Sequence, residues 1–148
     1  MKKQAYTVIA LVILVGSMAV TAQAQTGSRA QLVANIPFDF SAGDKILPAG
    51  EYIVRQVNPS ADRAVLQLRS KDGKTSAMVQ MNSVIDRSKS DEVASLIFNR
   101  YGKLYFFAAA WMPGNDGLAA SKSEAEKAAV KELAGIKSQT ETVALKHR

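Results

Sequence analysis

Acidic side chains are the main candidates for chemistry in this sequence, because it contains no cysteine and a single histidine, His147. Without cysteine or an internal histidine, the Ser–His–Asp and Cys–His arrangements of nucleophilic catalysis are absent. Zinc and haem sites built on histidine or cysteine are absent for the same reason. His147 stands next to the C-terminus, where we expect a frayed end. These absences exclude a large share of hydrolase and redox mechanisms.

The acidic residues form two groups in which carboxylates could come together. Asp39 and Asp44 flank a predicted turn, and Asp86, Asp91 and Glu92 fall in one polar loop. Paired carboxylates support glycoside hydrolysis, and clustered ones bind calcium. Neither group has the D-x-[DN]-x-[DN]-G spacing of a calcium loop. We therefore interpret both groups as solvated or turn-forming acids, and we predict no catalytic residue, metal ligand or cofactor.

Aromatic residues are the second candidate for a site. Tyr105, Phe107 and Trp111 share one parity of a predicted strand over residues 104–111, so they are expected on one face of it. An exposed aromatic face can stack on sugars or bases, as on oligosaccharide-binding barrels. An aromatic strand is more often part of a core. We favour the core, and a ligand-facing role for these three residues is the alternative.

The first 24 residues have the three parts of a secretion signal in the expected order. Lys2 and Lys3 give a positive start, and residues 5–20 are uncharged and mainly apolar. Ala22 and Ala24 then fit the small-x-small site of signal peptidase. A retained membrane anchor is the alternative, but a span needs about 20 predominantly apolar residues, and this stretch is shorter and ends in a polar segment. We expect cleavage near Ala24 and export to the periplasm or the extracellular space.

The mature chain, residues 25–148, has the length of one domain and can bury a single core. The formal net charge of the full chain is +6, and it falls when the two lysines of the signal are removed. A basic balance suggests nucleic acid for a cytosolic protein, but export and scattered positive residues argue against it here. No disulfide can brace the fold in an oxidising compartment. The expected partner is an envelope component or a small apolar ligand.

Most of the mature chain has the patterning of strands and turns. The predicted strand runs are residues 30–40, 51–57, 65–69, 77–81, 93–98 and 104–111. Pro37 marks the first run as an edge strand or breaks it, because proline cannot donate to a ladder. Asp72 and Gly73 predict a tight hairpin with positive φ at both central positions.

The C-terminal part changes character. Overlapping capping boxes at Ser121 and Ser123 predict a helix over about residues 121–134. Its apolar face is thin, so it must dock on the sheet, and the small side chains of Ala108 and Ala110 offer a place.

These elements predict one mainly β domain over residues 25–148. It has a strand-rich core at 30–112, the helix at about 121–134 and a possible last strand at 140–146. The expected architecture is a single antiparallel β-barrel or β-sandwich of about seven strands, with one C-terminal helix before a final strand.

Two blocks of sequence carry a resemblance. IPFDF at 36–40 is followed by LPAGEY at 47–52, and F-x-RYG at 98–102 is followed by YFF at 105–107 and W-x-PG at 111–114. Together they resemble a group of short exported bacterial proteins of acidobacterial type whose function is unknown. The resemblance spans roughly residues 30–146 and implies one all-β domain. It implies no activity and no ligand-binding residue.

Three functions are compatible with these observations. The leading hypothesis is a non-catalytic exported or envelope β-domain that acts in binding or structure. The alternative is a carrier that holds a small apolar ligand inside the barrel or sandwich, suggested by the aromatic and methionine content. A carboxylate-based hydrolase using Asp86, Asp91 or Glu92 is a distant third.

Overall fold

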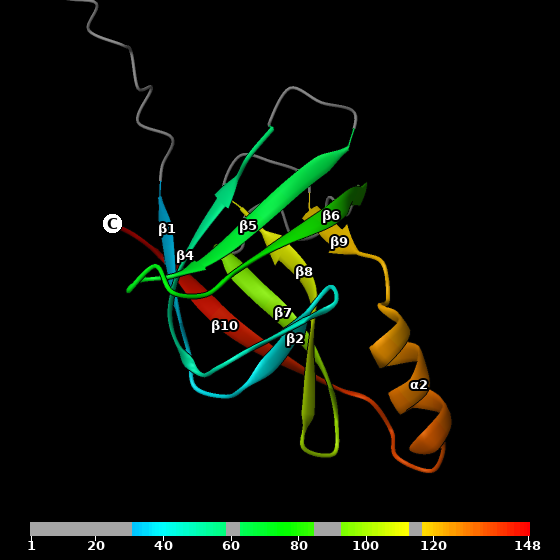
Figure 1. Ribbon diagram of the computed structural model, residues 1–148. Helices are drawn as coiled ribbons and strands as arrows, with labels where there is room; N and C mark the ends of the chain where they lie inside the picture. The colour runs from blue at the N-terminus through cyan, green and yellow to red at the C-terminus, as the bar shows by residue number, and fades with distance from the viewer. Residues whose placement is uncertain (1–30, 59–62, 85–92, 113–116) are drawn as a thin grey trace, which may run out of the picture.

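The computed structural model describes residues 31–58, 63–84, 93–112 and 117–148. Eight strands form a closed antiparallel barrel, which resolves the choice between barrel and sandwich (Figure 1). In order around the barrel they are β1 (Leu32–Ile36), β4 (Gly50–Gln56), β5 (Ala64–Ser70), β6 (Ser76–Val84), β9 (Gly117–Ala120), β8 (Leu104–Trp111), β7 (Ser95–Tyr101) and β10 (Gln139–His147). β10 pairs with β1 and closes the ring.

Three further elements lie on this barrel. β2 (Phe40–Ala42) and β3 (Lys45–Leu47) form a short antiparallel hairpin. β2 joins the sheet through a parallel pairing of Ser41 with Phe106 of β8. The helix, α2 (Glu124–Glu132), lies outside the barrel beside the β7–β8 hairpin (Figure 1). The predicted order of a helix followed by a final strand is confirmed.

The first predicted strand is divided in two at the proline. β1 ends at Ile36, and the chain resumes strand pairing only at Phe40. Pro37 lacks the N–H that a ladder requires, so the break falls where the sequence indicated. The predicted alternation holds within β1, where Leu32, Ala34 and Ile36 are buried.

The hairpin between β5 and β6 forms as predicted, but its turn differs. Gly73 has a φ of 75°, whereas none of the described residues other than glycine has a positive φ. Asp72 therefore does not adopt the left-handed conformation that the Asp-Gly pair suggested. Its carboxylate instead accepts hydrogen bonds from the Ser70 hydroxyl and the Lys74 N–H, which stabilise the longer turn.

Side chains fill the described interior of the barrel. The largest fully buried ones are Tyr52, Phe40, Phe98, Ile36, Leu47, Leu66, Leu68, Met81, Leu96 and Val54. Phe98 is central, because its ring makes edge-to-face contacts with Phe38, Phe40 and Phe107 at centroid distances of 5.2–5.8 Å. Such pairs add to the free energy gained from area burial alone. Phe38 and Phe40 thus bring the break between β1 and β2 into the core.

The helix docks at a different place from the one the sequence suggested. Tyr101, Phe106 and Ala129 form a small apolar cluster of their own, with Val130 and Leu133 packed against it. Ala110 is instead fully buried in the barrel core. The prediction that α2 lies on Ala108 and Ala110 is wrong, because the outward side chain on β8 that it covers is Phe106.

A buried carboxylate anchors the N-terminal turn of α2. Ser123 caps the helix and accepts a hydrogen bond from the Glu126 N–H at 3.2 Å. The Glu126 side chain is only 3% exposed. Its Oε1 accepts from Asn99 Nδ2 at 2.8 Å and from the Tyr101 hydroxyl at 3.2 Å. The helix is therefore attached to β7 by hydrogen bonds as well as by apolar contact.

Candidate functional site

The three predicted aromatic residues do not form one exposed platform. Phe107 is buried in the core. Tyr105 is half-buried and stacks on Phe38, with ring centroids 3.9 Å apart. Trp111 is half-buried at the other end of β8, and its ring lies directly against the backbone of Gly117. Two of the three thus pack on core phenylalanines, Phe107 on Phe98 and Tyr105 on Phe38, and the third contacts β9.

A β-bulge explains why Trp111 separates from the other two. The register between β7 and β8 shifts after Ile97, so that Ile97 pairs with Ala109 while Phe98 pairs with Phe107. The extra residue, Ala108, reverses the alternation of side chains. Ala110 then faces the core, and Trp111 faces the opposite way. The expectation of one aromatic face assumed an unbroken alternation of side chains along β8, so it placed Trp111 on the same face as Tyr105 and Phe107.

The predicted acidic groups do not combine into a site in the described residues. Asp39 accepts a hydrogen bond from the Ala49 N–H at 2.8 Å and so fixes the turn before β4. Asp44 lies at the tip of the β2–β3 hairpin. Asp86, Asp91 and Glu92 fall outside the described residues. No group of three or more metal-ligating side chains occurs in the part of the chain that the structure describes.

His147 does not lie in a frayed end. It is the last residue of β10 and pairs with Leu32 of β1, with its side chain exposed. It stays in the ladder because β10 remains paired with β1 up to this residue.

The residues that carry the resemblance hold the fold together. In the F-x-RYG block, Asn99 and Tyr101 bind Glu126. Arg100 forms an ion pair with Glu141 of β10 at 3.2 Å, and Gly102 has the φ of 61° that the β7–β8 turn requires. In the LPAGEY block, Tyr52 is buried and its hydroxyl donates to the Pro48 carbonyl at 2.6 Å. These motifs have structural roles in turns, core and strand attachment.

Among the described residues, a groove lies in the barrel wall, and we call it the seam groove. β9 pairs with only the last four residues of β6, Met81–Val84. β6 is nine residues long, so its first five residues, Ser76–Gln80, have a strand partner on one side only, β5, among the described residues. The β2–β3 hairpin lies beside this stretch without pairing with it. Lys45 Nζ bridges the two by donating to the Ser76 carbonyl at 3.0 Å.

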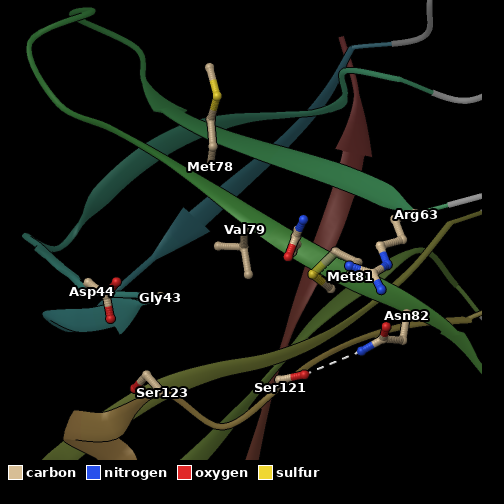
Figure 2. A pocket seen from close by; sticks show the side chains of 10 residues that line it. Gly43, Asp44, Arg63, Met78, Val79, Met81, Asn82, Ser121 and Ser123 are labelled. Carbon is tan, nitrogen blue, oxygen red and sulfur yellow. Dashed lines mark hydrogen bonds between the residues drawn. The ribbon is translucent and has the colours of Figure 1, made fainter. Parts of the chain in front are cut away.

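The seam groove has a volume of about 590 Å³ and a mainly polar wall. One wall is the hairpin tip at Gly43 and Asp44, and the other is β6 from Met78 to Asn82, with Arg63 beside it. Ser121 and Ser123 close the end toward α2, where Asn82 Nδ2 donates to the Ser121 hydroxyl at 3.3 Å. Figure 2 shows Val79 pointing into the space between Asp44 and Ser121, whereas Met78 points away on the other side of the strand.

A second, smaller pocket of about 390 Å³ lies between the turn before β4 and the β5–β6 turn. Its lining residues come from both turns and include Tyr52, Lys71 and Lys74. Burial raises the pKa of the Tyr52 phenol, so this group is neutral at physiological pH. Lys71 is engaged with Glu51 at 3.0 Å. These contacts brace the turns and bring no reactive pair together.

Sequence reasoning did not identify the seam groove. Its residues come from β6, the hairpin tip and the segment before α2, which are far apart in the chain. The groove results from the difference in length between β9 and β6, and neither length is marked by a motif. Of the candidate site residues named from the sequence, only Asp44 lines it, while Ser121 and Ser123, which also line it, were singled out as helix caps.

None of the described helices is long and apolar enough to cross a membrane. The chain matches no known protein family, no curated protein and no solved structure.

Proposed function

We propose that this protein is a non-catalytic β-barrel domain of the cell envelope, exported by its first 24 residues, which binds another envelope component in the seam groove. The observation that carries the proposal is the groove itself. It is a concave region with a polar wall, and it remains where β9 is too short to pair with all of β6. Ligand sites in proteins are usually concave and carry a few convergent polar groups.

The apolar interior supports binding on the barrel wall more than carriage of a ligand inside it. The ring of Phe40 contacts those of Tyr52 and Phe98, each at a centroid distance of 5.3 Å, in the middle of the barrel. A ligand in that space would have to displace these close-packed side chains. Native mass spectrometry of protein purified from its own envelope tests this point, and a mass increment from a retained apolar ligand would favour the carrier alternative.

The chemistry of the described carboxylates also supports a non-catalytic role. Glu126 anchors α2, and Asp39 fixes a turn. Glu51 pairs with a lysine of the β5–β6 turn, and Glu141 pairs with an arginine of β7. A hydrolase would be revealed by turnover of envelope glycans or peptides that is lost when Asp86, or Asp91 with Glu92, is changed to the amide. Such turnover would replace the proposal.

Binding to fractionated envelope is the direct test. The mature chain, starting at Gln25, is immobilised and exposed separately to purified cell-wall glycan, lipid vesicles and envelope proteins. We expect saturable binding of one fraction. Gln80→Arg, which places a long charged side chain on the groove wall, should weaken it at least about tenfold, the effect of roughly 1.4 kcal/mol.

The matched control is Thr142→Arg. Thr142 is exposed on β10, which does not line the groove. This variant adds the same charge to a strand of the same barrel, so it should bind as the unchanged protein does. Equal loss in both variants, or no saturable binding of any fraction, would contradict the proposal. The N-terminal residue of the protein isolated from the envelope tests export independently.

A further inference from the structure

The seam groove contains main-chain hydrogen-bonding groups of β6, and their direction follows from the ladder. The Ser70 N–H donates to the Thr75 carbonyl at 2.9 Å, so these two residues form a hydrogen-bonded pair at the turn. In an antiparallel ladder such pairs alternate with non-hydrogen-bonded ones. With the observed register, Ala77, Val79 and Met81 direct their N–H and C=O groups toward β5.

The residues between them must therefore point the other way. Ser76, Met78 and Gln80 direct their main-chain groups away from β5, toward the hairpin. One contact confirms this direction independently, because the Ser76 carbonyl accepts from Lys45, which lies on that side. The N–H groups of Met78 and Gln80 and the carbonyl of Met78 thus point into the seam groove, where β6 has no strand partner among the described residues.

We propose that the seam groove binds an extended segment of another polypeptide, which adds to β6 as a strand over Met78–Gln80. This deepens the proposed function and rests on it, because it names the class of partner that the groove takes. Donors and acceptors that alternate along a strand edge are complementary to an extended backbone. An added strand would lie about 4.8 Å from β6.

The side chains around the edge define the partner further. A partner residue opposite Val79 points to the same face as Val79, and Val79 and Met81 give that inner side an apolar surface. The neighbouring partner residues point outward, where Met78 and Ile46 of β3 are 63% and 80% exposed. The segment should therefore carry a small apolar side chain facing inward and adaptable side chains facing outward.

The closed ends of the groove favour a single strand over a second folded copy. The free edge is five residues, roughly 16 Å at 3.3 Å per residue. β9 bounds it at one end and the Lys45 contact at the other. A folded copy would bring its own second strand beside the added one, and the tip of the β2–β3 hairpin occupies that side. A flexible segment has no such neighbour.

Hydrogen exchange in the free protein is the first test. The amides of Met78 and Gln80 should exchange at least about 100-fold faster than those of Ala77 and Val79, because the latter open only when the ladder opens. Equal protection of all four amides at low protein concentration would show that the edge is already paired, and would overturn the proposal.

The second test uses a synthetic peptide pool as the probe. The peptides have eight residues and alternate threonine with a varied apolar or polar residue. We expect members of the pool to bind the mature chain and to slow exchange at Met78 and Gln80. The best binder is then made with N-methyl groups on alternate amides, in both parities. Only the peptide whose methyl groups are on the amides that face β6 should bind more weakly, by at least about fivefold for each lost hydrogen bond.

A pair of protein variants tests the same bond from the other side. Gln80→Pro removes the N–H that points into the groove without removing a bond to β5, whereas Gln80→Thr changes the side chain and keeps the N–H. The proline variant should bind peptide at least about fivefold more weakly than the threonine variant. If Gln80→Pro unfolds, the pair of methylated peptides decides alone.

Other outcomes would overturn the proposal. No binder in the pool, or equal losses for both methylated parities, excludes strand addition. Protection that rises with protein concentration together with dimer formation identifies a second copy as the occupant. Protection that disappears when residues 25–30 are removed identifies this N-terminal segment of the mature chain as the occupant. If envelope binding is lost in Gln80→Arg but is equal in Gln80→Pro and Gln80→Thr, the proposed function stands and strand addition fails.

Discussion

Replacing Glu126, the buried carboxylate of α2, should measure how much its hydrogen bonds to β7 stabilise the fold, separately from its interaction with the helix dipole. Glu126 and Glu124 both lie in the first turn, so both interact favourably with the helix dipole. Only Glu126 is buried, and only its side chain bonds to β7, through Asn99 and Tyr101. Glu124 is exposed and pairs with Lys127 at 2.7 Å. Glu126→Ala and Glu124→Ala therefore form a matched pair.

The expected difference follows from these contacts. A hydrogen bond to a charged group contributes about 1.5–3 kcal/mol, and the two donors share one oxygen, so we expect Glu126→Ala to cost about 3 kcal/mol. The exposed Glu124–Lys127 pair is expected to contribute below about 1 kcal/mol. Alanine's slightly higher helix propensity offsets part of either loss. Glu126→Gln keeps an acceptor oxygen and should cost about 1 kcal/mol.

Urea denaturation of the mature chain measures these free energies of unfolding, with an unchanged dependence on urea as the check on two-state behaviour. In thermal unfolding, a loss of about 3 kcal/mol lowers Tm by roughly 10 °C for a domain of this size. Losses of equal size for Glu126→Ala and Glu124→Ala would refute the reasoning. A double variant with Tyr101→Phe tests it further, because the two effects should fall short of adding if the bond is real.

Three further predictions concern other parts of the fold. Gly117→Ala should destabilise the domain by about 1–3 kcal/mol, because the new methyl group overlaps the ring of Trp111. Trp111 is the only tryptophan, so its fluorescence reports the change, and Gly117→Ala should cost much less stability in a Trp111→Leu background. Burial raises the pKa of Tyr52, so the stability it contributes is fully present below about pH 10 and is lost as the pH rises further. Above pH 10 the unfolding midpoint of Tyr52→Phe should fall less steeply with pH than that of the unchanged protein, and identical slopes would contradict this. The hydrogen bond from Ser70 lowers the pKa of Asp72, so the stability that Asp72 contributes is present above about pH 4 and is lost as the pH falls further. In acid unfolding, Asp72→Asn should lose less stability than the unchanged protein, and an equal loss would argue against this role.

Local features of this fold were readable from the sequence because local chemistry sets them. The alternation of β1 predicted its buried face, and Pro37 marked the place where pairing stops. Ser123 with Glu126 predicted the start of α2 to within a few residues. The weak alternation at 140–146 was enough to find β10. Each of these depends on residues within one turn or one strand.

Features set by distant contacts were not readable. β10 lies between β7 and β1, a position that depends on two strands far away in the chain. The bulge at Ala108 has no sequence signal, so counting along β8 placed Trp111 on the wrong face. The docking site of α2 was missed for a related reason, because small alanines looked like room for a helix whereas Phe106 offers more apolar area to bury.

Barrel closure and the candidate site have the same origin in this protein. A closed barrel normally leaves no strand edge open to association. Here β9 covers four residues of β6, and the β2–β3 hairpin pairs with β8 but lies beside β6 without pairing with it, joined to it by the Lys45 hydrogen bond. An edge on the open surface would invite aggregation between folded copies. This edge lies inside a groove whose walls exclude a neighbouring sheet, so the arrangement that protects it from other barrels is also the one that selects a single extended strand.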